Sequence, residues 1–168
     1  NGKLATFFVG PMSKDNDLDK LRYFTRECLN IGLDLRYTEK IKEKIWDKFI
    51  FLSAYSGMTT LTGLSIGEIF ENTTHKNMFI SAMHEAFNLS SFFRIEFNYD
   101  PIEKWLEKIE KMPYDLTSSM YLDFKKGKKL ELNWLSGLIC SYAKKFKINS
   151  NIHQKIVDGI KLNNPSLV

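Results

Sequence analysis

The chain has 168 residues, 43% of them hydrophobic and 14% aromatic, which is enough for a folded core and excludes a disordered segment. The formal net charge of +4 is small and the lysines are mixed with acids along helical segments, so we expect no nucleic-acid partner. Cys28 and Cys140 lie far apart without a second Cys or His at metal-ligand spacing, which is typical of reduced thiols in a cytoplasmic protein. No metal site is predicted.

Residues 1–38 predict a strand, a helix and a second strand. The run at 4–10 is rich in Phe and Val, apolar residues recur at helical spacing over 16–30, and residues 33–37 alternate. Such a unit has two open sheet edges and a thin core, so we expect the end of a larger α/β domain. An open edge would also allow pairing between chains in a homodimer. Because the chain opens with Asn1 and not Met, we expect part of a longer protein.

The character of the sequence changes at Thr38, which is a good helix cap. Beyond Lys48 there is no charge until Glu68, and Ser, Thr and Gly fill much of the run. The length is borderline for a membrane span, but the composition is too polar and the chain offers no second candidate. We therefore expect a buried helix that ends at Gly63, and no membrane partner.

The remainder has helical periodicity with few strand signals. We expect a mainly α fold with a β-α-β unit at 1–38 and a helical domain at 39–168. The helices are predicted at residues 74–92, from Pro101 to Met112, and at 118–126, 133–146 and 151–162.

Lys48 shares one predicted helix face with Ile41, Ile45 and Leu52. In one interpretation the lysine stem packs on this apolar face while the ammonium reaches water. In the other, the charge is partly desolvated and the lysine pKa falls toward the range of a general acid.

Glu131 lies between Leu130 and Leu132, ahead of a helix for which Asn133 is a plausible cap. The carboxylate would stabilise a helix N-terminus there through the helix dipole. The alternative is a functional carboxylate that accepts a hydrogen bond from a substrate hydroxyl or holds a lysine.

Ser118 and Ser119 stand at the start of another short helix. Both residues are equally good helix caps. Functionally, hydroxyls beside free backbone N–H groups would suit a substrate carboxylate.

These residues fall in two segments that resemble the ketopantoate reductase family. Residues 45–69 are similar to the start of its C-terminal helical domain, with Trp46, Lys48, Gly67 and Glu68 at the expected places. Residues 118–148 are similar to its second signature. The matching residues there are Ser118, Ser119, Met120, Asp123, Gly127, Glu131 and Gly137.

The resemblance implies a helical bundle of the 6-phosphogluconate dehydrogenase C-terminal-like type, preceded by the β-α-β remnant of a nucleotide-binding domain. It implies NADPH-dependent reduction of 2-dehydropantoate, a small 2-keto acid, to pantoate in pantothenate and coenzyme A synthesis. Lys48 would protonate the ketone oxygen, and Glu131 would bind the substrate hydroxyl, orient the lysine and contact the cofactor weakly. Ser119 would hold the carboxylate, with Ser118 and Ser56 also lining the substrate site. NADPH would be bound mainly by an N-terminal domain absent from this chain.

Three positions depart from the family pattern. Leu52 and Ser56 stand where asparagines usually follow the lysine by four and eight residues, and Ile66 replaces an asparagine before the Gly-Glu pair. Two alternatives therefore stay open: a reductase for another 2-keto acid, and a non-catalytic helical domain for dimerisation or binding.

Overall fold

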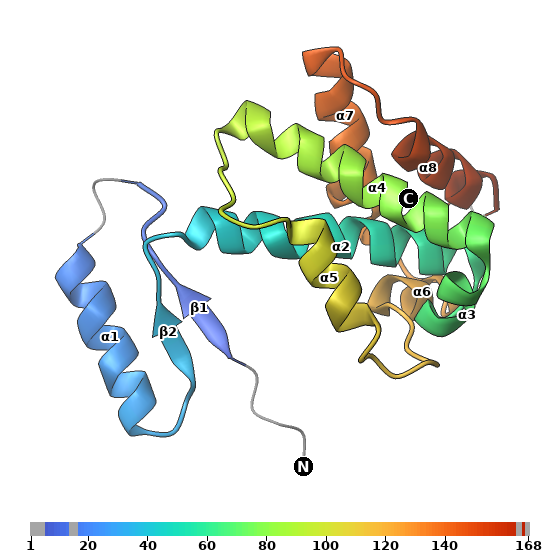
Figure 1. The fold of residues 1–168 in the computed structure, drawn as a ribbon. Helices are drawn as coiled ribbons and strands as arrows, with labels where there is room; N and C mark the ends of the chain where they lie inside the picture. The colour runs from blue at the N-terminus through green and yellow to red at the C-terminus, as the bar shows by residue number, and fades with distance from the viewer. Residues whose placement is uncertain (1–5, 14–16, 164–165, 167–168) are drawn as a thin grey trace. The chain divides into compact units, whose positions relative to one another are not determined.

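The computed structural model describes residues 6–13, 17–163 and 166, and the chain divides into two compact units at residues 1–46 and 47–168 (Figure 1). The division falls inside helix α2 (Ile41–Thr62). The sequence places the domain boundary a few residues earlier, after residue 38.

The first unit contains strand β1 (Phe7–Val9), helix α1 (Leu18–Asn30) and strand β2 (Leu35–Tyr37). The strands are parallel, with Phe7 opposite Leu35. The predicted strand–helix–strand order is confirmed, although residues 4–5 and 16 of the predicted elements lie outside the described residues.

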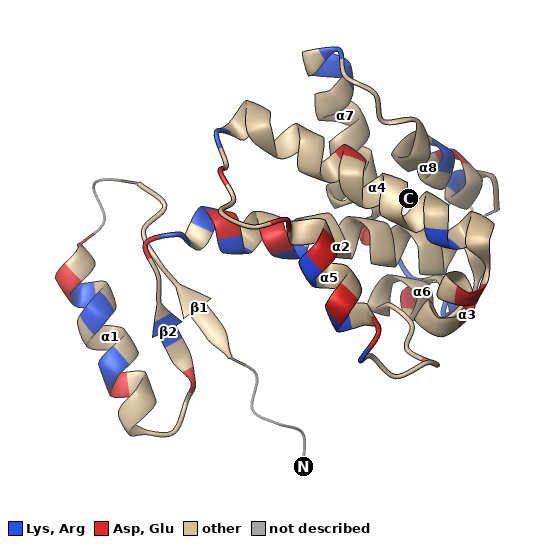
Figure 2. Cartoon of the chain, viewed as in Figure 1, with Lys and Arg blue, Asp and Glu red and all other residues tan. Residues whose placement is uncertain are grey.

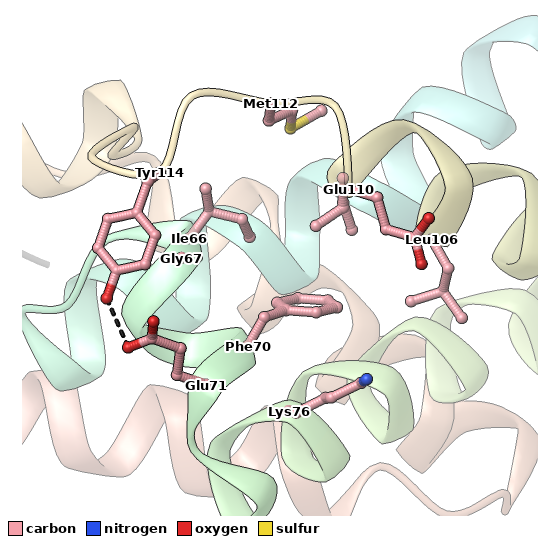
Figure 3. A pocket seen from close by; sticks show the side chains of 10 residues that line it. Ile66, Gly67, Phe70, Glu71, Lys76, Leu106, Glu110, Met112 and Tyr114 are labelled. Atoms are coloured by element: carbon pink, nitrogen blue, oxygen red, sulfur yellow. Dashed lines mark hydrogen bonds between the residues drawn. The ribbon is translucent and has the colours of Figure 1, made fainter.

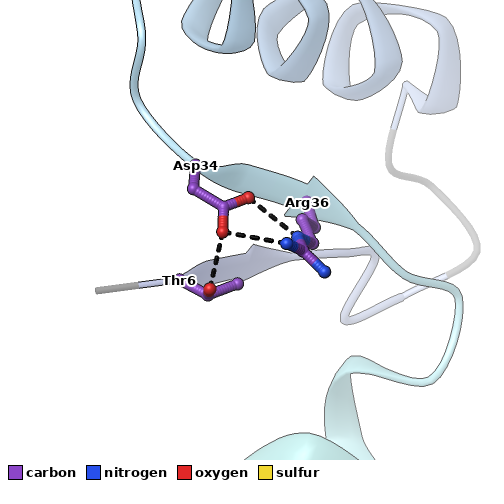
Figure 4. A network of polar contacts seen from close by, with 3 residues as sticks. All are labelled: Thr6, Asp34 and Arg36. Atoms are coloured by element: carbon purple, nitrogen blue, oxygen red, sulfur yellow. Dashed lines mark hydrogen bonds and ion pairs between the residues drawn. The ribbon is translucent and has the colours of Figure 1, made fainter. Parts of the chain in front are cut away.

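A polar network joins the starts of the two strands (Figure 4). The Thr6 hydroxyl donates to Asp34 Oδ2 at 2.6 Å, and Arg36 donates to both oxygens of the same carboxylate, at 2.8 and 3.0 Å. The Arg36 guanidinium, and then the Thr6 hydroxyl, hold the pKa of Asp34 below its usual value. The network supports the register of the parallel pair.

Helix α2 begins at Ile41, and the prediction that Thr38 caps it is wrong. The Thr38 N–H donates to the Val9 carbonyl at 2.9 Å, which extends the β-ladder and keeps Thr38 outside the helix. Its hydroxyl accepts from the Lys40 N–H at 3.1 Å and so forms a local turn. The predicted end is confirmed, since Gly63 has a φ of +72°, a conformation that favours glycine.

The second unit is helical, and the mainly α fold is confirmed. Most predicted helices agree with the structure, but the helix predicted at 133–146 begins at Ser136 and not at Asn133. The elements are α3 (Ile66–Glu71), α4 (Thr73–Ser90), α5 (Pro101–Ile109), α6 (Ser119–Lys125), α7 (Ser136–Phe146), α8 (Asn151–Asn163) and the 3₁₀ turns η1 (Ser91–Phe93) and η2 (Glu131–Trp134).

The uncharged part of α2 is buried, as the sequence predicts. Figure 2 shows charge at the start of this helix and none along the remainder. Phe51 stacks on Trp105 of α5 with ring centroids 4.1 Å apart. A Cβ at Gly57 would lie within 3.1 Å of Ser136 and Ile156, so α7 and α8 approach the helix closely there. In the described ranges no helix has the length and apolarity needed to cross a membrane.

Helix α4 contacts α3, α5, α7 and α8. Two buried polar side chains hold it to the C-terminal helices. Glu85 of α4 accepts the N–H groups of Ile152 and His153 at 2.8 and 2.9 Å. The His153 ring is fully buried, with Nδ1 3.1 Å from the Ser136 hydroxyl and Nε2 2.9 Å from the Ala82 carbonyl.

Candidate functional site

One face of α2 carries Lys48, Leu52, Ser56 and Thr59 at helical spacing. Lys48 is exposed, Leu52 is half-buried, Ser56 is 5% exposed and Thr59 is fully buried. The face is therefore open to solvent at Lys48 and closed at Thr59.

The surroundings of Lys48 do not support a desolvated ammonium within this chain. Ile45, which the sequence places on the same apolar face, is 49% exposed, and Lys48 itself is exposed. The described structure therefore agrees with the interpretation in which the lysine reaches water. Its use as a proton donor stays a prediction.

Ser118 is the N-cap of α6, as one interpretation predicts. Its Oγ accepts from the Tyr121 N–H at 3.1 Å and lies 2.7 Å from Thr59 Oγ1. Ser118 is only 3% exposed and its hydroxyl is engaged on both sides within the chain, so its direct contact with a substrate stays a prediction. Ser119 is exposed, and its hydroxyl has no partner in the described part of the chain.

The two leucines around Glu131 explain its position. Leu130 is 6% exposed and Leu132 is fully buried, so they anchor turn η2 while Glu131 between them is exposed. The prediction that Asn133 caps the following helix is wrong, because residues 131–134 form η2. A Cβ at Gly137 would lie 3.2 Å from the Leu132 carbonyl oxygen, so the turn packs closely against the start of α7.

The Thr59–Ser118 bond holds the beginning of α6 against α2, the helix that also carries Lys48. Among the described residues, no ion pair or hydrogen bond joins Lys48, Ser119 or Glu131 to another side chain. Three elements thus present a cation, a hydroxyl and a carboxylate at the surface. An ammonium can supply a proton, a hydroxyl can donate to an anion and a carboxylate can accept from a hydroxyl.

The Gly-Glu pair has a structural explanation. Glu68 and Ser65 form a capping box, with bonds of 2.7 and 3.3 Å, and the Ser65 N–H lowers the pKa of Glu68. The ring of Tyr114 lies directly on Gly67, where a Cβ would collide with it.

A cavity of about 560 Å³ lies elsewhere in the second unit (Figure 3). At its wall the Tyr114 hydroxyl donates to Glu71 Oε2 at 2.6 Å, which raises the pKa of Tyr114 to about 12. Neither Lys48, Ser119 nor Glu131 is among the described residues that line it. The lining residues are Ile66, Gly67, Phe70, Glu71, Lys76, Leu106, Ile109, Glu110, Met112 and Tyr114.

Residues 40–164 match the family described as "Ketopantoate reductase PanE/ApbA C terminal". The chain belongs to this family. A 2-dehydropantoate 2-reductase of Pyrococcus abyssi is 27% identical over 134 residues, which are 80% of this chain and 43% of that protein. The enzyme of the same name from Pyrococcus horikoshii is 26% identical over 113 residues, 67% of this chain and 37% of that protein. The chain thus spans less than half the length of these ketopantoate reductases.

Solved structures share the fold at low identity. A PanE/ApbA family ketopantoate reductase from Ralstonia eutropha has a TM-score of 0.78 at 19% identity, over 94% of this chain and 51% of that one. A dimeric ketopantoate reductase from Staphylococcus aureus gives 0.80 at 16%, over 98% and 56%. D-mandelate dehydrogenase with NADH and anilino(oxo)acetate gives 0.82 at 16%, over 95% and 66%.

Proposed function

We propose that this chain is the C-terminal domain of an NADPH-dependent reductase that converts 2-dehydropantoate to pantoate. The family match over residues 40–164 includes Lys48, Ser119 and Glu131, and the Pyrococcus relatives carry that enzyme name. The observation that carries the proposal is the exposure of these three side chains, none of which has a partner in the described part of the chain. Their neighbour Ser118, in contrast, is buried and bonded.

Each group would have its own role in binding or proton transfer. The Ser119 hydroxyl would donate to the substrate carboxylate, and Glu131 would accept from the substrate hydroxyl and orient the lysine. The Lys48 ammonium would stabilise the charge that develops on the ketone oxygen and then donate a proton to it. Ser56, 5% exposed on the same helix face as Lys48, would border the substrate.

The nicotinamide cofactor would supply the hydride, but the glycine that follows β1 does not fit its phosphates. Gly10, which follows β1, lies directly against the Thr38 carbonyl and so serves chain packing, not a phosphate cradle. We therefore propose that NADPH is bound mainly by a nucleotide-binding domain of the full-length protein, with residues 1–38 as its end. We also propose a homodimer, which the dimeric Staphylococcus aureus relative supports, and a cytoplasmic location.

The test is NADPH oxidation by the full-length protein with 2-dehydropantoate, alongside Ser119→Ala and Glu131→Gln. Losing a hydrogen bond to a charged group should lower kcat/KM about 10- to 100-fold in each variant. Thr117→Ala, beside the same helix cap, is the control and should stay near wild type. No turnover by a folded protein that binds NADPH would contradict 2-dehydropantoate as the substrate.

A second candidate is reduction of a more apolar 2-keto acid. Leu52 is half-buried on the Lys48 face and Ile66 is 1% exposed, where the family resemblance places asparagines. D-mandelate dehydrogenase, which shares the fold, is named for a substrate with an aromatic side chain. Turnover of phenylglyoxylate above 2-dehydropantoate, reversed by Leu52→Asn with Ser56→Asn, would favour this candidate. An unchanged preference would exclude these two positions as its cause.

A further inference from the structure

Thr59 of α2 is the middle of a buried chain of hydrogen bonds. Its hydroxyl donates to the Tyr55 carbonyl at 2.8 Å, and its Oγ1 lies 2.7 Å from Ser118 Oγ. Because the Thr59 hydroxyl proton points to the Tyr55 carbonyl, the Ser118 hydroxyl donates to Thr59 Oγ1. Ser118 in turn accepts the Tyr121 N–H at 3.1 Å. The chain of bonds therefore runs from the first turn of α6 to the backbone of α2.

Burial makes this connection stiff. Thr59 is fully buried and Ser118 is 3% exposed, so bulk solvent has little access to either partner. A buried hydroxyl left without its partner is costly. The start of α6 is therefore held at one place on α2.

That place lies on the helix face of Lys48. Thr59 follows Lys48 by eleven residues, which is three turns with a remainder of about 20°. Ser119, the next residue after the bonded Ser118, is held with respect to this face. We propose that Thr59 is a positioning residue that sets where the Ser119 hydroxyl meets the substrate carboxylate. This inference rests on the proposed reductase function.

The next residue in the chain provides a matched control. Thr60 is 4% exposed and so almost as buried as Thr59, but its hydroxyl has no hydrogen-bond partner in the part of the chain that the structure describes. Thr60→Val therefore removes the same atom from the same helix without touching the connection to α6.

The experiment compares Thr59→Val, Thr59→Ser and Thr60→Val in the full-length protein. For Thr59→Val we expect KM for the 2-keto acid to rise about tenfold, the equivalent of one hydrogen bond, while kcat changes less than about twofold. Thr59→Ser keeps the hydroxyl and should restore KM, and Thr60→Val should leave it unchanged. If Thr59→Val does not fold, Ser118→Ala must give the same rise in KM.

Amide hydrogen exchange at Tyr121 is the second readout, because that N–H depends on Ser118 for its hydrogen bond. Among Thr59→Val, Thr59→Ser and Thr60→Val, exchange should accelerate in Thr59→Val alone. The inference would be overturned if Thr59→Val had the same KM as wild type. It would also be overturned if Thr59→Val and Thr60→Val changed KM equally. A wild type without turnover would overturn the proposed function instead. Tyr121 exchange would then still decide whether Thr59 holds α6, and exchange equal in all variants would refute it.

Discussion

Tyr55 buries a hydroxyl that has no hydrogen-bond partner among the described residues, although its ring stacks on Phe51 with centroids 5.1 Å apart. Burial alone raises the pKa of Tyr55 to about 12. Tyr55→Phe keeps the stacking and removes the unpaired group, so we expect the free energy of unfolding in urea to rise by about 1 kcal/mol. Tyr114→Phe, which deletes the hydrogen bond to Glu71, should lower the free energy of unfolding. A Tyr55→Phe variant less stable than wild type would contradict this reading.

His153 makes stability depend on pH. The Ala82 carbonyl can only accept, so Nε2 carries the proton and Nδ1 accepts from Ser136. Burial lowers the pKa of His153 to about 4 from an ordinary 6.5. The unfolded chain therefore binds a proton first as the pH falls. This contribution to stability is complete above pH 6.5 and is lost as the pH falls toward 4.

We expect the free energy of unfolding to drop by about 2 kcal/mol between pH 7 and pH 5 for this reason. Urea titrations at both pH values measure it. His153→Gln should be less stable at pH 7 but should show a flatter pH dependence, whereas His84→Gln, at an exposed position of α4, should keep the wild-type slope. Equal slopes in all three proteins would show that His153 does not cause the effect.

At the scale of elements, α8 depends on a carboxylate from another helix. Glu85 of α4 accepts two N–H groups of the first turn of α8, at Ile152 and His153. Glu85→Gln replaces one accepting oxygen by a donor, so we expect a loss of roughly 1–3 kcal/mol in unfolding free energy. The control is Glu107→Gln, exposed on α5. A loss equal to that of the control would show that α8 does not need this cap.

The sequence predicts the order and type of these elements well, because helical periodicity and turn residues are local signals. Prediction from the sequence fails where a residue distant in the sequence determines the local structure. Thr38 is a residue type that often caps helices, but its N–H donates to the Val9 carbonyl and so continues the hydrogen bonding of the β-ladder. Asn133 likewise sits inside η2, which the buried Leu132 anchors. The cap that Glu85 provides has no local signature, since its partners are 67 and 68 residues away.

For the molecule as a whole, the family resemblance identified the candidate residues. The spacing of these residues in the sequence did not show which side chains are exposed and which are hydrogen-bonded inside the fold. Ser118 and Ser119 look equivalent in the sequence. The structure buries the first against Thr59 and leaves the second exposed. The Thr59–Ser118 bond crosses 59 residues and could not be predicted from either helix alone.

The most direct test of the proposed reductase is the turnover of the full-length protein with Lys48 changed. Lys48→Ala removes the proposed proton donor, so kcat for 2-keto acid reduction should fall about 10²- to 10⁴-fold. Lys42→Ala, an exposed lysine of the same helix, should remain within about twofold of wild type. A Lys48→Ala enzyme as active as the Lys42→Ala control would contradict the account and remove Lys48 from the chemistry.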